Sequence, residues 1–211
     1  MQWRKEPSCD ALDPGTIGGW WRWLAMAGRI ENLTTIHEGW VSLRMAQVRL
    51  DDGSLAAREI VDHPCGAAVL IYHPERRTAL LISELRPPVE WAGEPRLLEV
   101  VAGKLDEADA AACARREARE EAGVELGEME HVARLWATPA TSTERVDYFL
   151  AAISDDDRTG EGGGLEEEHE DVRVREIALA ELWRRADAGE LGDAKTFLLL
   201  QALRIRRPEL F

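Results

Sequence analysis

Several short stretches of this chain alternate between apolar and polar residues, which is the pattern of a half-buried β-strand. Residues 39–50 alternate in this way and are followed by the turn signal Asp51-Asp52-Gly53-Ser54. A hairpin is therefore predicted, with residues 57–63 as its return strand. Residues 1–30 are predicted to be irregular, because proline and glycine interrupt them. Further strands are predicted at 67–73, 78–85, 97–102, 130–137, 147–153 and 172–177.

Three helices are predicted, at residues 110–122, 179–188 and 194–205. The first is the best defined, since Asp109 is a suitable N-cap and Gly123 a suitable C-terminal stop. Its small alanine side chains form a narrow apolar stripe that fits closely against a sheet. Strands and helices are interspersed along the chain, so we expect an α/β (α+β) fold in which a mixed sheet has helices on both faces.

The composition narrows the class of protein. Of the 211 residues, 45% are hydrophobic and 31% charged, as is typical of a soluble globular protein. The net charge of −14 argues against a nucleic-acid-binding surface, which needs a clustered basic face. We find no apolar run long enough for a membrane and no signal peptide, so we expect a cytoplasmic protein. The cysteines Cys9, Cys65 and Cys113 show no metal-binding spacing and are expected to be reduced.

The most informative segment is the predicted helix at 110–122, which carries Glu117, Glu120 and Glu121 on one face. Like charges at this spacing destabilise an isolated helix by roughly 0.2–0.5 kcal/mol per pair. A bound cation would offset that repulsion, and carboxylate oxygens suit Mg²⁺, which usually also contacts substrate phosphates. The segment therefore predicts metal-assisted chemistry on a phosphate compound. A solvated helix with Glu–Arg pairs is the alternative interpretation.

Gly103, together with Arg116-Glu117, Glu120-Glu121 and Gly123-Val124, resembles the Nudix box of Nudix hydrolases. The chain departs from the usual box twice, because Asp109 replaces the first glutamate and the spacing from there to Arg116 is one residue shorter. The shorter spacing is similar to that of the GDP-mannose pyrophosphatase branch, which is close to the ADP-ribose pyrophosphatases. The likeness extends over roughly residues 66–205 and includes Glu84-Leu85-Arg86-Pro87-Pro88, Gly162-Gly163-Gly164-Leu165 and Asp193-Ala194-Lys195-Thr196.

The resemblance implies a Nudix-type α-β-α sandwich over residues 64–211, preceded by a tryptophan-containing segment and a small antiparallel sheet in residues 1–63. It implies Mg²⁺-dependent hydrolysis of the pyrophosphate bond of a nucleoside diphosphate sugar, either GDP-mannose-like or ADP-ribose. The products would be a nucleoside monophosphate and a sugar phosphate. Mn²⁺ is an alternative ion. A homodimer is expected, because in this branch the N-terminal sheet helps to build one.

The acids of the box receive separate roles. Glu117 and Glu121 lie one helical turn apart and are the expected direct metal ligands. By the resemblance, the carbonyl of Ala102 is a backbone ligand and Glu120 a bridging or water-mediated ligand. Arg116 is expected to orient one of the glutamates through a salt bridge.

The resemblance also assigns residues outside the box. Glu168 corresponds to the general base and Glu170 to a further metal ligand, with Glu166 or Glu167 as the base after a small shift in register. The preceding glycines are expected to let this loop close over a substrate. Arg86 is similar to a phosphate-binding arginine and Glu144 to a substrate-contacting acid. A surface arginine and a solvated turn are the alternative interpretations of these two.

Two other functions remain open. One is a Nudix enzyme that acts on another nucleoside diphosphate derivative. The other is a non-catalytic Nudix-fold module that senses a nucleotide. Retention of all three box acids favours an enzyme, because sensing modules commonly lose them.

Overall fold

The computed structural model describes residues 29–105, 109–164 and 171–211. These residues form two compact units. The first contains residues up to Cys65 together with Trp136–Arg145, and the second contains Gly66–Leu135 and Val146–Phe211. The division into residues 1–63 and 64–211 stays a prediction, and no sequence pattern indicated that segment 136–145 belongs to the first unit.

The first unit contains a three-stranded antiparallel sheet. Its strands are β1 (Arg29–Glu38), β2 (Ser42–Arg49) and β3 (Leu55–Asp62), in the order β1-β2-β3. The predicted hairpin is confirmed as β2 and β3, with Gly53 of its turn at a φ of 84°. Segment 136–145 lies beside β3, where the Val61 amide donates to the Thr141 carbonyl at 2.7 Å.

Strand β1 is not among the predicted strands, and its register explains why. Its apolar residues Ile30, Leu33 and Ile36 are three apart, whereas the faces of a regular strand alternate every two residues. The pairing with β2 shifts between Ile30 and Asn32 and again between Thr35 and His37. Each bulge adds an unpaired residue, so the period of two is lost. The prediction of irregular structure up to residue 30 is wrong for its last two residues.

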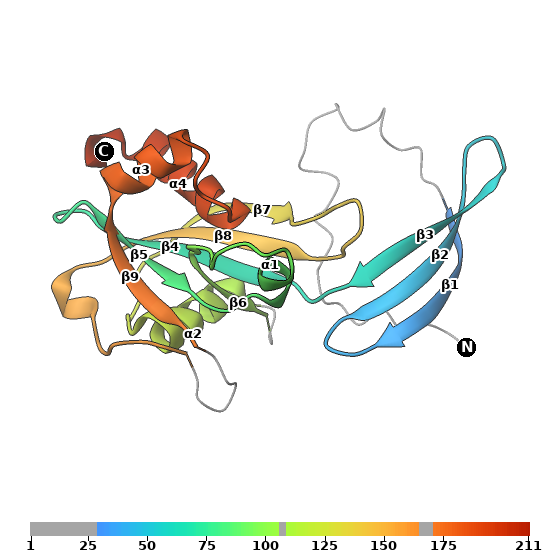
Figure 1. Cartoon of the computed structure of the whole chain (residues 1–211), viewed down its shortest axis with the longest axis horizontal. Coiled ribbons are helices and arrows are strands. Elements are labelled where there is room, and N and C mark those ends of the chain that lie inside the picture. Colours follow the sequence, from blue (N-terminus) through green and yellow to red (C-terminus); the bar gives the residue numbers. More distant parts are fainter. Residues whose placement is uncertain (1–28, 106–108, 165–170) are drawn as a thin grey trace. The chain divides into compact units, whose positions relative to one another are not determined.

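The second unit is built around a mixed sheet in the order β7-β8-β4-β5-β9 (Figure 1). The central strand β4 (Gly66–His73) pairs in parallel with β8 (Arg145–Ala152), and antiparallel with both β5 (Thr78–Ser83) and β6 (Val101–Lys104). Along one edge of β4, β6 pairs with the first half of the strand and β5 pairs with the second half. The outer strands are β7 (Glu130–Trp136) and β9 (Arg173–Ala178).

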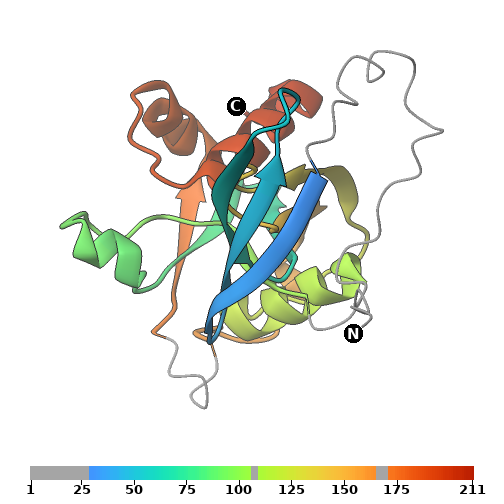
Figure 2. The same ribbon diagram turned by 90° about the vertical axis from the view of Figure 1, so that its right-hand side faces the viewer.

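Helices cover both faces of this sheet (Figures 1 and 2). Helix α2 (Ala110–Ala122) packs on one face, and α3 (Leu179–Asp187) with α4 (Ala194–Arg206) on the other. Strand β4 is buried on both sides because alternate residues serve the two cores: Ala67, Val69 and Ile71 face α2, while Ala68, Leu70 and Tyr72 face α3 and α4. The predicted α-β-α sandwich with an additional antiparallel sheet is confirmed.

Two segments differ from the predicted elements. Helix α1 (Pro87–Trp91) was not predicted, because its two prolines read as turn residues; proline is nevertheless favourable in the first turn of a helix. Strand β6 begins four residues later than predicted. Before it, Glu99 forms only an isolated bridge with Ile82, since the chain passes there from the edge of β5 to the edge of β4.

Helix α2 has the predicted bounds because both of its ends are well capped. The Asp109 carboxylate accepts hydrogen bonds from the amides of Ala111 at 2.9 Å and Ala112 at 3.1 Å. Gly123 ends the helix with a φ of 65°, a left-handed conformation that glycine adopts without strain. Two short 3₁₀ helices, Asp155–Asp157 and Pro208–Leu210, complete the second unit.

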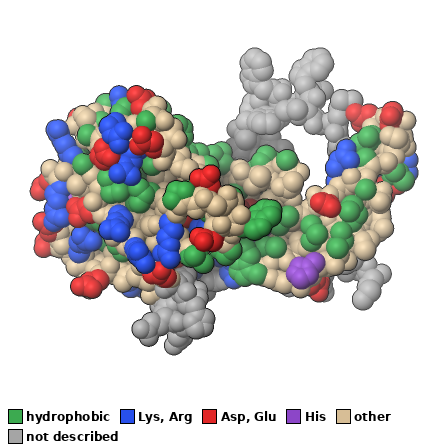
Figure 3. Space-filling model, in the orientation of Figure 1, with side chains coloured by type: hydrophobic (Ala, Val, Ile, Leu, Met, Phe, Trp, Pro, Cys, Tyr) green, Lys and Arg blue, Asp and Glu red, His purple; other side chains and the backbone are tan. Residues whose placement is uncertain are grey.

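The charged side chains of the second unit are mixed in sign. On the face drawn in Figure 3, basic and acidic groups are interspersed. Arg76 and Glu176 form one of the ion pairs of this unit, at 3.2 Å. Within the described ranges, no helix combines the length and apolar character that crossing a membrane requires. Cys113 is a buried free thiol, whereas Cys65 is disulfide-bonded, so the prediction of reduced cysteines is wrong for Cys65.

The Asp109 cap leads to a testable prediction. Asp109→Ala should lower the free energy of unfolding by about 1 kcal/mol, because two amides of the first turn lose their acceptor. Asp109→Asn keeps an acceptor oxygen and should stay within about 0.5 kcal/mol of the wild type. Urea unfolding of the three proteins measures the difference. Equal midpoints for the alanine variant and the wild type would show that the cap does not stabilise α2.

Candidate active site

The site is centred on the close approach of strand β6 to helix α2. A Cβ atom added to Gly103 would overlap the carboxylate of Glu117. Only a residue without a side chain therefore allows the acid of α2 to lie directly against the backbone of β6. Gly103 is itself held in place by pairing with Ala67 of the central strand β4.

Glu121 lies one turn further along α2 and is directed at the same strand. Its exposed fraction is 3%, and its Oε2 accepts a hydrogen bond from the Ala102 amide at 3.4 Å. Glu117 is also shielded, with 13% of its side chain exposed. Ala102, Gly103, Glu117 and Glu121 are thus brought together. The roles of Ala102, Glu117 and Glu121 as metal ligands stay predictions.

Arg116 lies between two of the box acids. Its Nη2 is 2.8 Å from Glu117 Oε1 and its Nη1 donates to Glu120 Oε2 at 3.1 Å. The same Nη2 also donates to the Lys104 carbonyl at 3.3 Å, which ties the arginine to the end of β6. These contacts place Glu120 beside Glu117. The functional roles of Arg116 and Glu120 stay predictions.

The chemistry of the groups that meet between β6 and α2 fits a hard divalent cation. The carboxylates of Glu117 and Glu121 are both shielded and supply oxygen ligands, the type that Mg²⁺ and Mn²⁺ prefer. Among the residues that the structure describes, no three His, Cys, Asp or Glu side chains form a metal-binding group by themselves. The predicted additional ligand Glu170 lies outside the described residues, as do Glu166, Glu167 and the predicted base Glu168.

The chain that leads to these acids is anchored on α2. The Gly163 amide donates to the Glu121 carbonyl at 2.9 Å, and the Gly164 amide to the Glu120 carbonyl at 3.1 Å. A Cβ on Gly162 would overlap the Glu121 carbonyl, and Gly162 has a φ of 70°. The glycines therefore permit close backbone packing on the end of α2, a reason that differs from the predicted loop closure.

The residue that follows these acids is anchored as well. Asp171 Oδ2 accepts a hydrogen bond from Arg96 Nη2 at 2.8 Å, and Arg173 lies 3.5 Å from the same oxygen. The Arg96 guanidinium holds the pKa of Asp171 below its ordinary value, chiefly through this hydrogen bond. Gly164 and Asp171, the described residues on either side of 165–170, are thus both hydrogen-bonded to the second unit.

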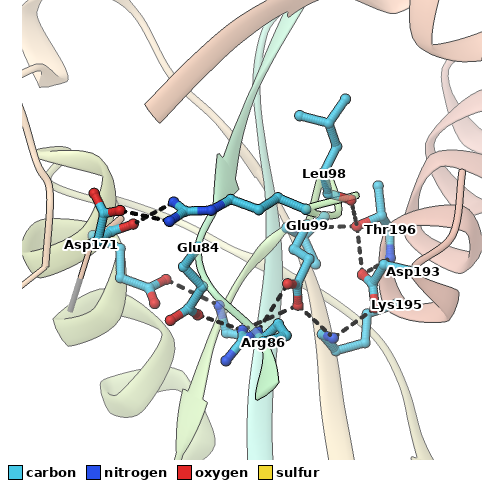
Figure 4. A network of polar contacts seen from close by, with 12 residues as sticks. Glu84, Arg86, Leu98, Glu99, Asp171, Asp193, Lys195 and Thr196 are labelled. Carbon is cyan, nitrogen blue, oxygen red and sulfur yellow. Dashed lines mark hydrogen bonds and ion pairs between the residues drawn. The ribbon is translucent and has the colours of Figure 1, made fainter. Parts of the chain in front are cut away.

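Arg86 belongs to an ionic network that the sequence did not reveal (Figure 4). Its Nε and Nη2 donate to the two oxygens of Glu99 at 2.9 and 3.1 Å, and Nη2 lies 2.6 Å from Glu84 Oε1. Lys195 of α4 reaches Glu99 Oε2 at 3.3 Å. In the sequence, Glu99 stands out as the one acid within the apolar run 97–102. Its partners Arg86 and Lys195 are distant in sequence, so the sequence did not indicate the network.

The pKa values of the network reflect these contacts. Burial alone would lower the pKa of Arg86, but the hydrogen bonds and charge of Glu99, with Glu84 and Glu121, raise it above the ordinary value. Burial would also lower the pKa of Lys195, but Asp193 and Glu99 raise it. Burial opposes ionisation of Asp193, yet the charge of Lys195 and hydrogen bonds from Lys195 and Thr196 lower its pKa. Arg86, Lys195 and Asp193 are therefore charged at neutral pH.

Glu144 lies in the first unit, among different neighbours. Its Oε1 is 3.7 Å from His63 Nδ1, and its amide donates to Ser142 Oγ at 3.1 Å. His63 in turn stacks edge-on against Trp40, with ring centroids 4.9 Å apart. These contacts describe a local cluster of the first unit. The substrate-contacting role of Glu144 stays a prediction.

Comparison with known proteins identifies a family and several relatives that match about two thirds of the chain or more. A family profile described as "NUDIX domain" matches residues 62–200. The chain is 38% identical to the GDP-mannose pyrophosphatase of Citrobacter koseri over 148 residues, which cover 69% of this chain and 76% of the relative. It is 38% identical to that of Cronobacter sakazakii over 151 residues, covering 71% and 78%. For that of Escherichia coli O157:H7 the identity is 36% over 150 residues, covering 70% and 78%.

The contact between Gly103 and Glu117 can be tested by adding one methyl group. Gly103→Ala should lower the free energy of unfolding by about 1–3 kcal/mol, because the new Cβ forces Glu117 or β6 to move. Gly127→Ala is the matched control, since a Cβ there meets nothing within 4 Å. Urea unfolding measures both variants. Equal stability of the two would contradict the close approach of β6 and α2.

Proposed function

Because the chain belongs to the Nudix hydrolase family, we propose that it is a metal-dependent enzyme that hydrolyses the pyrophosphate bond of a nucleoside diphosphate sugar. GDP-mannose is the first candidate substrate, since the named relatives are GDP-mannose pyrophosphatases. The products would be a nucleoside monophosphate and a sugar phosphate. Family membership itself identifies the chain as a Nudix pyrophosphohydrolase.

The observation that carries the proposal is the convergence of Glu117 and Glu121 on the backbone of β6. Shielded carboxylates one helical turn apart attract a divalent ion, and the Ala102 carbonyl would complete the corner with a neutral oxygen. Mg²⁺ is the proposed ion, with Mn²⁺ as an alternative. When bound, it would neutralise the charge that develops on the pyrophosphate oxygens.

Residues of the chain would bind the substrate, orient the metal ligands and accept the proton of the attacking water. Arg86 would bind a phosphate oxygen, since its charge is fixed and it is partly exposed. Arg116 would hold Glu117 and Glu120 in orientation through its ion pairs. Glu168 would take the proton from the attacking water, and Glu170 would add a metal ligand. The hydrogen bonds of Gly163 and Gly164 to the carbonyls of Glu121 and Glu120 support this assignment, because they bring the chain before the two acids to the end of α2.

Hydrolysis of substrates by the purified protein tests the proposal. With Mg²⁺, the wild type should release a nucleoside monophosphate and a sugar phosphate from GDP-mannose, other nucleoside diphosphate sugars or ADP-ribose, and the products show which bond breaks. Glu121→Gln should lose most activity, on the order of a hundredfold or more, because it weakens the metal site. The control is Glu125→Gln, at an exposed acid that pairs with Arg119.

The outcomes of this assay distinguish an enzyme from a nucleotide-sensing module, and they also test the metal assignment. Activity of the wild type and of Glu125→Gln, with loss in Glu121→Gln, would support the enzyme and rank its substrates. An inactive wild type that binds GDP-mannose tightly would instead support the nucleotide-sensing module. Full activity of Glu121→Gln would contradict the metal assignment.

We also propose that the protein is a homodimer that uses the sheet of the first unit. All residues of β1 are exposed, and Ile30 and Ile36 have exposed fractions of 55% and 53%. Apolar side chains on an edge strand are suited to contact with another chain. Light scattering should give about twice the chain mass of 23.6 kDa. A mass equal to one chain at micromolar concentration would contradict the dimer.

A further inference from the structure

Glu99 is a buried acid whose position is fixed by its backbone. Its exposed fraction is 3%. The Ile82 amide donates to the Glu99 carbonyl at 2.8 Å, and the Glu99 amide donates to the Ile82 carbonyl at 2.9 Å. Its neighbours Leu98 and Val100 pack in the core beneath α3 and α4. A carboxylate in such a place is strongly disfavoured unless cations and hydrogen bonds compensate for its lost hydration.

Two cations from distant parts of the chain supply that compensation (Figure 4). Arg86, the residue before α1, makes a two-point contact with both Glu99 oxygens. Lys195, in the first turn of α4, contacts Glu99 Oε2. The two-point contact is directional, because the planar guanidinium must lie in line with the carboxylate. Glu99 therefore fixes the orientation of Arg86 as well as its charge.

The contacts of Arg86 leave one part of its guanidinium for a ligand. Nε and Nη2 donate to Glu99, and Nη2 also faces Glu84. Within the described part of the chain, Nη1 makes no hydrogen bond to the protein, and 36% of the side chain is exposed. An arginine held on one edge and open on the other is suited to present Nη1 to an anionic oxygen without losing side-chain freedom on binding.

The first turn of α4 holds Glu99 from the other side. Asp193, the N-cap of α4, contacts Lys195 Nζ at 2.7 Å and accepts hydrogen bonds from the Thr196 amide and hydroxyl at 2.9 and 2.6 Å. Thr196 Oγ1 in turn accepts from the Val100 amide at 2.8 Å. The helix is thus joined to the strand on which Glu99 lies. This connection holds Lys195 in contact with the Glu99 carboxylate.

We propose that Glu99 is a positioning residue that orients Arg86 toward the pyrophosphate, and that Lys195 holds Glu99 in place. The inference rests on the proposed function, and it adds a role for an acid that contacts neither the substrate nor the metal. It explains why a charged side chain interrupts the apolar segment before β6. A neutral residue of equal size would fill the space but would not align the guanidinium.

A double-mutant cycle tests whether Glu99 acts through Arg86. Glu99→Gln should lower kcat/KM on the best substrate by about 10- to 100-fold, the usual effect of losing a residue that orients a functional group. Arg86→Met keeps the stem of the side chain but removes the guanidinium. In the Arg86→Met background, Glu99→Gln should change kcat/KM by less than about threefold, because there is no guanidinium left to orient. Losses that multiply in the double variant would overturn the proposal.

Glu130→Gln is the matched control. Glu130 also binds two cations, Arg206 at 2.8 Å and Arg207 at 3.2 Å, and it also joins a strand to α4, but at the opposite end of that helix. The variant should keep wild-type kcat/KM. A loss equal to that of Glu99→Gln would mean that any weakening of contacts to α4 reduces activity, and would overturn a specific role for Glu99.

A measurement without turnover separates this inference from the proposed function. In a ¹⁵N–¹H spectrum the Arg86 Nε–H signal is the one that disappears in Arg86→Lys. It should be sharp in the wild type and in Glu130→Gln, but broadened or lost in Glu99→Gln and weakened in Lys195→Met. An unchanged signal in Glu99→Gln would overturn the positioning role, even in an active enzyme. A wild type that is inactive on every substrate but shows the predicted spectra would overturn the proposed function and leave Glu99 as the residue that fixes Arg86.

Discussion

The contact between Gly103 of β6 and Glu117 of α2 is the constraint on which the rest of the site depends. It requires a residue without a side chain on the strand and a helix whose acids face the sheet. Pairing with β4 fixes the strand, and the caps at Asp109 and Gly123 fix the length of the helix. A shift of either element by one residue would turn Glu117 and Glu121 away from the backbone of β6.

Around this contact the fold gathers segments that are distant in sequence. The amides of Gly163 and Gly164 donate to carbonyls in the last turn of α2. Thr196, in the first turn of α4, accepts a hydrogen bond from the Val100 amide, just before β6. Each of these junctions buries polar or charged groups, which costs free energy unless the partners are complete. Here the partners come from the elements that form the two cores. The same packing that stabilises the sandwich therefore also sets the geometry of the charged groups.

The sequence predicted those parts of the molecule that are set by local chemistry. Helix α2 was placed correctly because its caps and small apolar stripe are encoded within a few residues of each other. Strand β1 was missed because its bulges remove the period of two, and α1 because its prolines resembled a turn. The roles of Glu99 and Lys195 could not be inferred from the sequence, since nothing local indicates that residues 86, 99 and 195 meet. Such contacts follow only from the order of the strands and the position of α4.

The most direct test of the account is whether Glu117 and Glu121 hold a divalent ion. Titration with Mn²⁺, followed by the electron paramagnetic resonance of the free ion, measures this without a substrate. Wild type and Glu125→Gln should bind Mn²⁺ alike, while Glu117→Gln and Glu121→Gln should bind it at least tenfold more weakly. Equal binding by all four proteins would contradict the account, because the corner of β6 and α2 would then not be the metal site.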